Sequence, residues 1–303
     1  MKVLVTGGKG FIGRPVVAAL LAADYEVAII DYRTDSPNIP NTRCHSVDIC
    51  NDKEVDQVFN MERPEYVIHL AAQVNVNNSL ENPGFDAKSN ILGTINILEC
   101  CRKYNVQKII YASTAAVYGE PIYLGIDEEH PVEPISFYGL SKLSAERYIL
   151  SFSKLYQMKF TILRYSNVYG PTSSHKETDD VISLFHNRLL ENKAPIIYGD
   201  GNQTRDYIYV SDVADANLAA IKQADNQILN ISTNKPTTLN ELVALLSHFT
   251  DKKNPPQYVD NRDGDIIHSY LDNTKALSQL DWKINYPLES GLGTFYTNQN
   301  RGE

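Results

Sequence analysis

The chain places a tyrosine and a lysine four residues apart, in the segment Tyr138-Gly139-Leu140-Ser141-Lys142. This spacing puts both side chains on one face of a helix. A free phenol has a reference pKa of about 10, and a nearby ammonium ion favours the phenolate and brings this pKa toward neutral. An exposed helical pair is the alternative interpretation. We favour acid–base chemistry because the apolar run 109–112 leads into Ser113 and Thr114, where a hydroxyl can meet a substrate.

A glycine-rich segment follows the apolar run 3–5 near the start of the chain. Gly8, Gly10 and Gly13 satisfy the pattern GxGxxG, and Gly7, Gly10 and Gly13 satisfy a wider GxxGxxG. Glycines at this spacing allow a tight turn, a close approach of the backbone to a pyrophosphate, and packing of a helix on a strand. The free N–H groups at the start of that helix then face the phosphates. The segment predicts a dinucleotide site.

The second apolar run, residues 27–30, ends at an aspartate that indicates which dinucleotide binds, NAD or NADP. Asp31 lies close to the spacing of about 20 residues that is typical of a ribose-binding acid. Its carboxylate accepts hydrogen bonds from ribose hydroxyls and repels a 2′-phosphate, which favours NAD over NADP. Arg33 is a counter-signal, since a nearby arginine tolerates that phosphate.

The elements that must position these residues alternate along the first half of the chain. Short apolar runs at 3–5, 27–30, 66–70, 109–112 and 161–163 are separated by segments with helical periodicity. This alternation predicts an α/β fold, a doubly wound parallel sheet of the Rossmann type with a smaller C-terminal α/β lobe. We expect residues 1–165 to form the NAD-binding domain and to recruit about 203–230, where 205–210 looks like a strand. Residues 166–202 and 231–303 would form the substrate lobe.

Composition excludes several classes of partner. The net charge of −9 over 303 residues argues against nucleic acid or an anionic membrane as the main partner. No apolar run approaches the roughly 18 residues of a membrane span, and Met1 leads straight into the first expected strand. The four cysteines form no CxxC pair and no metal-type spacing with histidine, so we expect no metal site. We therefore expect a cytoplasmic protein with reduced thiols.

Taken in order, these motifs resemble those of the extended short-chain dehydrogenase/reductases. More narrowly, the chain is similar to nucleotide-sugar epimerases of the UDP-glucose (UDP-galactose) 4-epimerase type over essentially its whole length. The matching segments are the glycine loop, Asp31, His69-Leu70-Ala71-Ala72, Asn90, Ser113-Thr114, Tyr138 with Lys142, residues 163–171, 199–201, 204–210 and 262–265.

The resemblance implies a role for each matching residue. Thr114 would bond the sugar 4-hydroxyl, Tyr138 would remove its proton, and Lys142 would tune Tyr138 and hold the nicotinamide ribose. The cofactor would also be lined by Gly7, Gly10, Phe11, Ile12, Gly13, Asp31, Tyr32, Asp48, Ile49, Leu70, Ala71, Ala72, Gln73, Asn90, Tyr165 and Ser166. Asn167, Arg205 and Arg262 would hold the substrate diphosphate, with Tyr198 and Asp265 at the uridine.

The implied reaction uses bound NAD⁺ without consuming it, through a transient 4-keto sugar. Three alternatives stay open: a 4-ketoreductase, a 4,6-dehydratase or related decarboxylase, and a non-catalytic NAD-binding regulatory protein. Dehydratases and decarboxylases carry an acid after the catalytic threonine, whereas Thr114 is followed by Ala115-Ala116-Val117-Tyr118-Gly119. That segment favours simple epimerisation.

Two further expectations concern the sugar and the assembly. The position that limits bulk at the sugar 2-carbon corresponds to Ser269, whose small side chain favours N-acetylhexosamines as further substrates. Family members pair through helices that correspond to residues 90–104 and 141–156, so the resemblance implies a homodimer.

Overall fold

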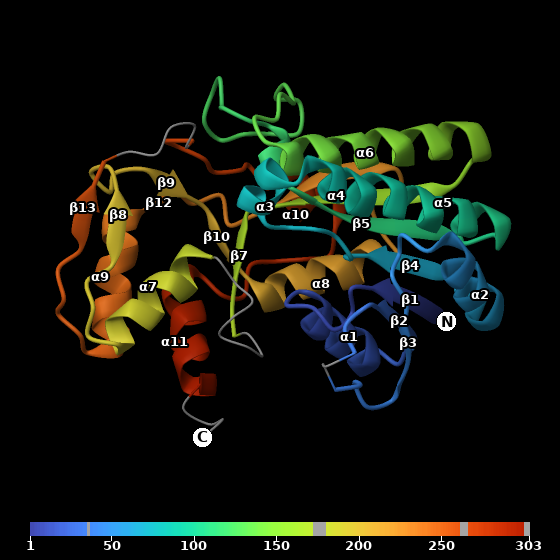
Figure 1. The fold of residues 1–303 in the computed structure, drawn as a ribbon, viewed down its shortest axis with the longest axis horizontal. Coiled ribbons are helices and arrows are strands. Elements are labelled where there is room, and N and C mark those ends of the chain that lie inside the picture. The colour runs from blue at the N-terminus through green and yellow to red at the C-terminus, as the bar shows by residue number, and fades with distance from the viewer. Residues whose placement is uncertain (35–36, 172–179, 261–265, 300–303) are drawn as a thin grey trace.

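A parallel sheet of seven strands forms the centre of the computed structural model, which describes residues 1–34, 37–171, 180–260 and 266–299 (Figure 1). The strand order is β3-β2-β1-β4-β5-β6-β11. The bounds are β1 Lys2–Thr6, β2 Glu26–Asp31, β3 Thr42–Ser46, β4 Tyr66–His69, β5 Lys108–Thr114, β6 Lys159–Tyr165 and β11 Gln227–Ile231. Because chain order reverses at β1, which pairs with both β2 and β4, the carboxyl ends of these strands form the crevice where doubly wound sheets bind ligands.

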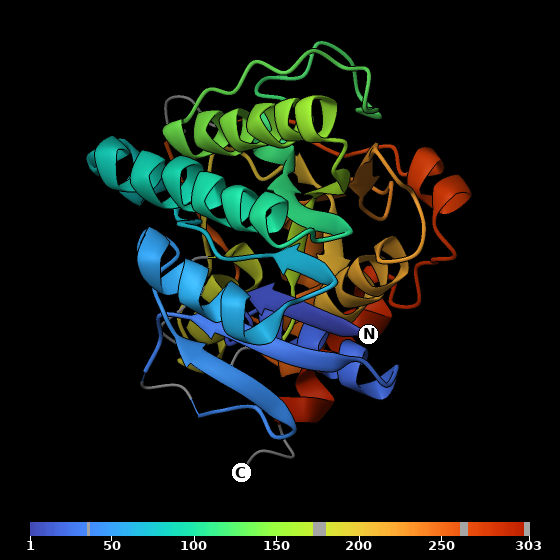
Figure 2. The same cartoon turned by 90° about the vertical axis from the view of Figure 1, so that its right-hand side faces the viewer.

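Helices cover both faces of this sheet, which explains why its inner strands are apolar on both sides. Helices α2 (Asp52–Glu62), α5 (Gly93–Lys103) and α6 (Phe137–Tyr156) lie on one face, and α1 (Gly13–Ala22) and α8 (Val210–Ala220) lie on the other (Figure 2). The expected doubly wound fold is confirmed.

A smaller lobe lies beyond the carboxyl ends of the strands. It contains α7 (Val181–Leu190), α9 (Leu239–Thr250), α11 (Leu288–Gln299) and the paired strands β8 (Ile196–Tyr198) and β13 (Gln257–Val259) (Figure 1). Its helices pack around a core of their own that includes Phe185, Leu189, Leu242, Leu246 and Leu292.

The strand expected over residues 205–210 is interrupted and lies outside the large sheet. Strand β9 (Thr204–Arg205) pairs with β12 (Thr237–Thr238), and β10 (Tyr207–Tyr209) pairs with β7 (Asn167–Tyr169). The interruption falls at Asp206, whose buried carboxylate bonds Thr233. The later strand β11 is the one that extends the large sheet, beside β6.

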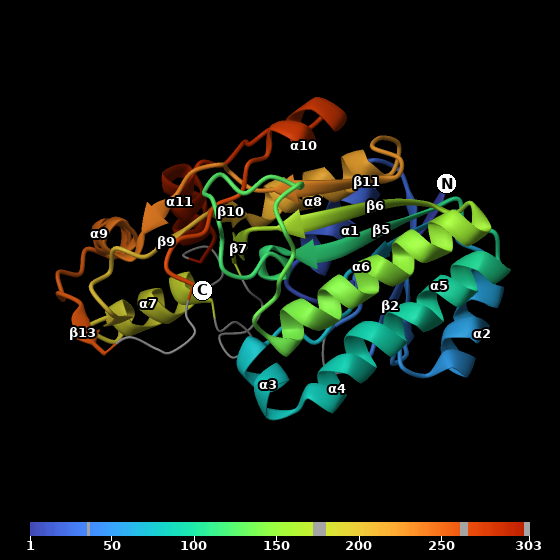
Figure 3. The same cartoon turned by 90° about the horizontal axis from the view of Figure 1, so that it is seen from above.

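A nearly continuous helical segment runs from β4 toward β5 along the outer edge of the crevice. It comprises α3 (Val76–Glu81), α4 (Pro83–Ala87), a π-helical turn (Lys88–Leu92) and α5, and it lies beside α6 (Figure 3). A 3-10 turn (Ala115–Val117) follows β5, and α10 (Thr274–Gln279) packs near β11. In the described residues, no helix has the length and apolar character needed to cross a bilayer.

Candidate active site

The glycine turn has the geometry that the sequence predicts. Gly7 adopts a φ of +69°, and its carbonyl accepts a hydrogen bond from the Gly10 N–H at 3.0 Å. A Cβ at Gly13 would lie 2.1 Å from the Gly7 oxygen, so only glycine lets the helix start so close to the turn. Among the described residues, Ile12 at the start of α1 makes no side-chain cap, so the helix presents main-chain N–H groups that suit phosphate oxygens.

Asp31 stands at the carboxyl end of β2 with its side chain 4% exposed. One carboxylate oxygen accepts from the Lys9 N–H at 2.9 Å and the other from the Arg33 N–H at 3.0 Å. These bonds fix the carboxylate beside the glycine turn and leave each oxygen a further lone pair for a ribose hydroxyl. The adjacent Tyr32 side chain is exposed.

The segment after β4 touches the glycine turn. The Thr6 hydroxyl accepts from the Ala71 N–H at 3.1 Å, and a Cβ on Gly7 would lie 2.8 Å from the Ala71 nitrogen. The Leu70 N–H donates to the Thr6 carbonyl at 3.1 Å. Close contact therefore brings residues 70–73, predicted to line the cofactor, to residues 7–13.

Asn90 secures the same segment from the π-helical turn. Its side-chain oxygen accepts from the Gln73 N–H at 2.8 Å, and its amide donates to the Gln73 carbonyl at 2.9 Å and the Ser141 hydroxyl at 3.0 Å. The buried Asn90 side chain thus links β4, α5 and α6. π-Helical turns often lie at functional sites because they redirect one side chain.

The predicted adenine residues follow β3. Ile49 is buried against α5, where a Cβ on Gly93 would lie 2.6 Å from it. Asp48 is exposed, and its carboxylate accepts from the Cys50 N–H at 2.9 Å. The glycine turn, the fixed Asp31 and the residue 70–73 segment together fit a dinucleotide with unmodified ribose hydroxyls.

Thr114 and Tyr138 lie together at the carboxyl end of β5, and Lys142 lies one turn further along α6. Thr114 ends this strand, while Tyr138 and Lys142 lie one turn apart in α6, which begins after the Ser136 cap. The Thr114 side chain lies close enough to the Tyr138 phenol to lower its pKa. The Lys142 ammonium lies 4.4 Å from the centre of the Tyr111 ring and is buried.

Burial dominates the electrostatics of this trio. It lowers the pKa of Lys142 to about 7, although the carboxylates of Glu146 and Asp86 act in the opposite direction. Burial also raises the pKa of Tyr138 to about 12; the Thr114 side chain opposes the rise and Asp86 adds to it. The sequence predicted the opposite direction for Tyr138. That prediction considered the neighbouring ammonium and left out the cost of burying a phenolate.

The predicted substrate residues lie between the sheet and the smaller lobe. Asn167 is exposed at the start of β7, and Arg205 in β9 donates from its guanidinium to the main-chain oxygens of Thr204 and Ile267. The Ser269 N–H donates to the Thr204 oxygen at 3.1 Å, so Ser269 lies beside Arg205. Tyr198 is half-buried at the end of β8.

One predicted cofactor residue has a side chain that points away from the expected position, and two predicted substrate residues lie outside the described residues. The Tyr165 side chain points into the core and its hydroxyl pairs with Asn217, so only its main chain is placed at the strand end. Arg262 and Asp265 fall outside the described residues.

Sequence reasoning missed the buried polar side chains that support the trio. Glu146 pairs with Arg164 and accepts from Ser113 at 2.5 Å, while Asp86 binds Gln73 and Asn90. The four-residue interval from Lys142 to Glu146 was visible in the sequence. Asp86, in a short helix without regular periodicity, gave no comparable signal.

Comparisons with known proteins identify the family of the chain. Residues 3–232 match the model of the NAD dependent epimerase/dehydratase family. A curated Methanocaldococcus jannaschii protein is 48% identical over 96% of this chain and 95% of its own. The chain belongs to the NAD dependent epimerase/dehydratase family.

Solved structures of epimerases share the family fold with this chain. A UDP-glucose 4-epimerase of Thermotoga maritima, crystallised with UDP-glucose, has a TM-score of 0.96 and 39% identity, covering 100% of this chain and 99% of that one. A UDP-N-acetylglucosamine 4-epimerase of Methanobrevibacter ruminantium, in complex with UDP-N-acetylmuramic acid, has a TM-score of 0.92 and 32% identity at 100% and 99% coverage.

Proposed function

We propose that this family member catalyses the NAD-dependent 4-epimerisation of a nucleotide-sugar. The substrate pair would be UDP-glucose and UDP-galactose, with UDP-N-acetylglucosamine and UDP-N-acetylgalactosamine as further substrates. The observation that carries the proposal is the placement of Thr114 at the end of β5 beside Tyr138 of α6, with Lys142 one turn away, at the strand ends beside the glycine turn. The named relatives with these activities support it.

Each member of the trio has a part in proton transfer. Thr114 orients the sugar 4-hydroxyl toward Tyr138, which accepts its proton as C4 is oxidised and returns a proton as C4 is reduced. Lys142, when protonated, favours the Tyr138 phenolate and binds the nicotinamide ribose. Bound NAD would supply reversible hydride transfer at C4.

The phenolate must overcome the burial that raises the pKa of Tyr138 to about 12. A bound, positively charged nicotinamide would add a second cation to that of Lys142. We therefore expect the tyrosine to become an effective base only in the cofactor-bound protein, where proton removal coincides with the oxidised cofactor.

We propose that the substrate binds to residues that lie between the sheet and the smaller lobe. Arg205 and Asn167 would bind the diphosphate, because a guanidinium fork suits a pyrophosphate. Arg262 would add a second fork, with Tyr198 and Asp265 at the uridine. The small Ser269 beside Arg205 would leave room for an N-acetyl group.

A 4-ketoreductase and a 4,6-dehydratase remain the alternative functions. The residues after Thr114 form a 3-10 turn of Ala115, Ala116 and Val117, which places no carboxylate there for a dehydration step. A non-catalytic NAD-binding protein would not need Tyr138 placed beside Thr114 at the end of β5.

We also propose a homodimer built on α5 and α6. These helices lie side by side on the outside of the sheet (Figure 3), and several apolar side chains of α6 are exposed. Leu155 is 70% exposed, and Leu140 and Tyr148 are also exposed. Burying them between two copies removes apolar surface from water.

The proposed domains are 1–165 with about 203–230, and 166–202 with 231–303. Free thiols at all four cysteines support the cytoplasm as the compartment.

Product analysis tests the proposed reaction. The purified protein would be incubated with UDP-, GDP- and dTDP-sugars without added cofactor, and the products separated by chromatography. An epimer formed without added nicotinamide indicates retained NAD, whereas products that need NADPH indicate a ketoreductase. Activity on UDP-glucose with none on UDP-N-acetylglucosamine would refute the role of Ser269.

Tyr138→Phe tests the proposed acid–base group. We expect turnover to fall by about 10³-fold or more because no other group takes the proton from O4. NAD binding and the unfolding midpoint should stay unchanged. Tyr148→Phe, in the same helix but exposed, is the matched control. Equal turnover in the two variants would exclude the mechanism.

A further inference from the structure

The Asp86 carboxylate is buried beside the proposed catalytic trio, with only 1% of the side chain exposed. One oxygen, Oδ1, accepts from the Gln73 side-chain amide at 2.8 Å and from the Asn90 amide at 3.2 Å. Within the described part of the chain, the second oxygen, Oδ2, is buried without a hydrogen-bond partner. Burying a carboxylate oxygen without a hydrogen-bond partner costs free energy of folding, so such a group in a stable fold needs an explanation.

The bonds of Asp86 tie it to the residues around Lys142. Asn90, which binds Asp86, also donates to the hydroxyl of Ser141, the residue before Lys142 in α6. Helix α4, which carries Asp86, packs against α6. The charge of Asp86 acts on both Tyr138 and Lys142, and it raises the pKa of each.

The other charged and titratable groups around Lys142 differ from Asp86 in their charge or in their partners. From β4, His69 is buried and neutral, since burial and the Lys142 charge lower its pKa to about 3. From β5, Tyr111 contributes its ring face at 4.4 Å. From α6 itself, Glu146 is already joined to Arg164 through two hydrogen bonds, at 3.0 and 2.7 Å. Glu146 nevertheless raises the pKa of Lys142 more than Asp86 does, whereas Asp86 is bonded to the neutral amides of Gln73 and Asn90.

We propose that Asp86 is a positioning residue whose negative charge, added to that of Glu146, favours the ammonium form of Lys142 and sets the pH range in which Tyr138 and Lys142 work together. This inference rests on the proposed function. Burial alone would leave Lys142 neutral, and a neutral amine could not favour the phenolate. The carboxylate acts through these two residues and does not transfer a proton itself.

The sign of the effect follows from the two pKa values. Asp86 raises the pKa of Tyr138, which must lose a proton, and that of Lys142, which must keep one. Removing the charge therefore lowers both, and both limbs of the pH–rate profile move toward acid. We expect a displacement of about one pH unit toward acid, so that the variant loses activity at pH values where the wild type is still active.

Asp86→Asn tests the charge because it keeps the size of the side chain and a carbonyl acceptor for Gln73 and Asn90. Asp86→Ala removes both charge and acceptor, and Asp52→Asn, on exposed α2, is the charge-matched control. The pH dependence of kcat and kcat/KM, the NAD dissociation constant between pH 6 and 9, and the unfolding midpoint would be measured for each protein.

The expected result is an acid shift in the rate profile and in the pH dependence of NAD affinity for Asp86→Asn, with none for Asp52→Asn. A uniform loss of activity at every pH, or coincident profiles, would overturn the inference, because a purely structural role moves no midpoint. If the wild-type protein forms no epimer, the proposed function fails instead. The NAD titration still decides the role of Asp86 in that case.

Discussion

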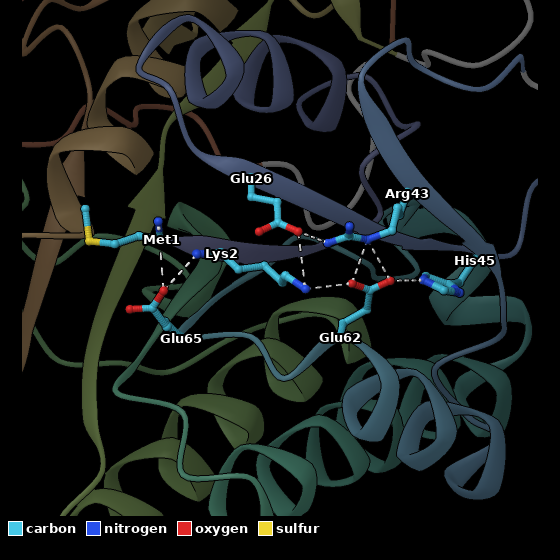
Figure 4. Close-up of polar contacts among 7 residues, drawn as sticks. All are labelled: Met1, Lys2, Glu26, Arg43, His45, Glu62 and Glu65. Carbon is cyan, nitrogen blue, oxygen red and sulfur yellow. Dashed lines mark hydrogen bonds and ion pairs between the residues drawn. The ribbon is translucent and has the colours of Figure 1, made fainter.

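Two buried carboxylates lie at opposite ends of the same sheet and have opposite surroundings. Glu62, the last residue of α2, lies at the amino ends of the strands and is 4% exposed (Figure 4). Asp86 lies near the carboxyl ends of the strands and is 1% exposed. The two are equally hidden from water, so their differences come from the partners that the fold gives them.

Both Glu62 oxygens are paired several times. One accepts from Lys2 at 3.2 Å and from Arg43 at 2.8 Å, and the other bonds His45 at 2.7 Å and Arg43 at 3.1 Å (Figure 4). Glu26 joins the cluster through Lys2 and Arg43. These bonds outweigh the burial and lower the pKa of Glu62.

Around Asp86 the balance is reversed, since burial outweighs the attractions. The pKa of Lys142 falls to about 7 and that of Tyr138 rises to about 12, so each group is displaced toward its uncharged form. This comparison indicates that paired charges stabilise this fold. Charges with too few partners are concentrated at the proposed active site, where protons must move.

Several substitutions would distinguish the cluster around Glu62 from the cluster around Asp86. Of these, Lys142→Met is expected to have the largest effect. Turnover should fall by about 10²- to 10³-fold, since the phenolate loses its ammonium neighbour. The unfolding midpoint should stay the same or rise, because a buried cation with a net unfavourable environment is removed. Initial rates and calorimetry provide both values. A large loss of stability would show that Lys142 is a structural cation like those around Glu62.

Glu62→Ala should have the converse effect. It leaves Lys2, Arg43 and His45 without their common partner, and we expect the free energy of unfolding to fall by about 3 kcal/mol in urea titrations. The kcat should not change, because the cluster lies at the far end of the sheet. Glu26→Ala, at a carboxylate that is 52% exposed, is the control and should cost less than about 1 kcal/mol. Equal losses in the two variants would contradict the role assigned to burial.

The smallest expected effect is a pH dependence of stability. The folded pKa of Lys142 is about 7 and its unfolded value is 10.5, so between these values the unfolded state binds more protons. Stability therefore rises with pH across this window. We expect the cofactor-free wild type to gain on the order of 2 kcal/mol relative to Lys142→Met between pH 7 and 9.5. Parallel curves for the two proteins, from urea titrations, would contradict the depressed pKa.

The strands that were predicted from the sequence are those with continuous apolar runs. The runs at 3–5, 27–30, 66–70, 109–112 and 161–163 correspond to β1, β2, β4, β5 and β6. Strand β3 was missed because its sequence, Thr-Arg-Cys-His-Ser, is polar and it lies at the sheet edge. Strand β11 was missed because its neighbours are loops, and only pairing with β6 shows that it belongs to the sheet.

The parts of the site that were predictable are those with local spacing. Gly7 to Gly13, Asp31 at a strand end, and Tyr138 with Lys142 each lie within one turn or one strand connection, where geometry follows from helix and strand periods. Asp86, Asn90, Ser141 and Gln73 come together only through the packing of α4, the π-helical turn and α6. Their sequence separations carry no period that would reveal the contact.

The sequence by itself determined the doubly wound sheet, the glycine turn and the family, and it supplied the residues that we propose for acid–base chemistry. These follow from apolar periodicity and from short-range spacing, which act before the chain is packed. Only the tertiary structure decided the direction of the pKa changes at Tyr138 and Lys142, and the full pairing of Glu62. Desolvation and charge contacts depend on which distant segments close around a group, and no local pattern in the sequence encodes them.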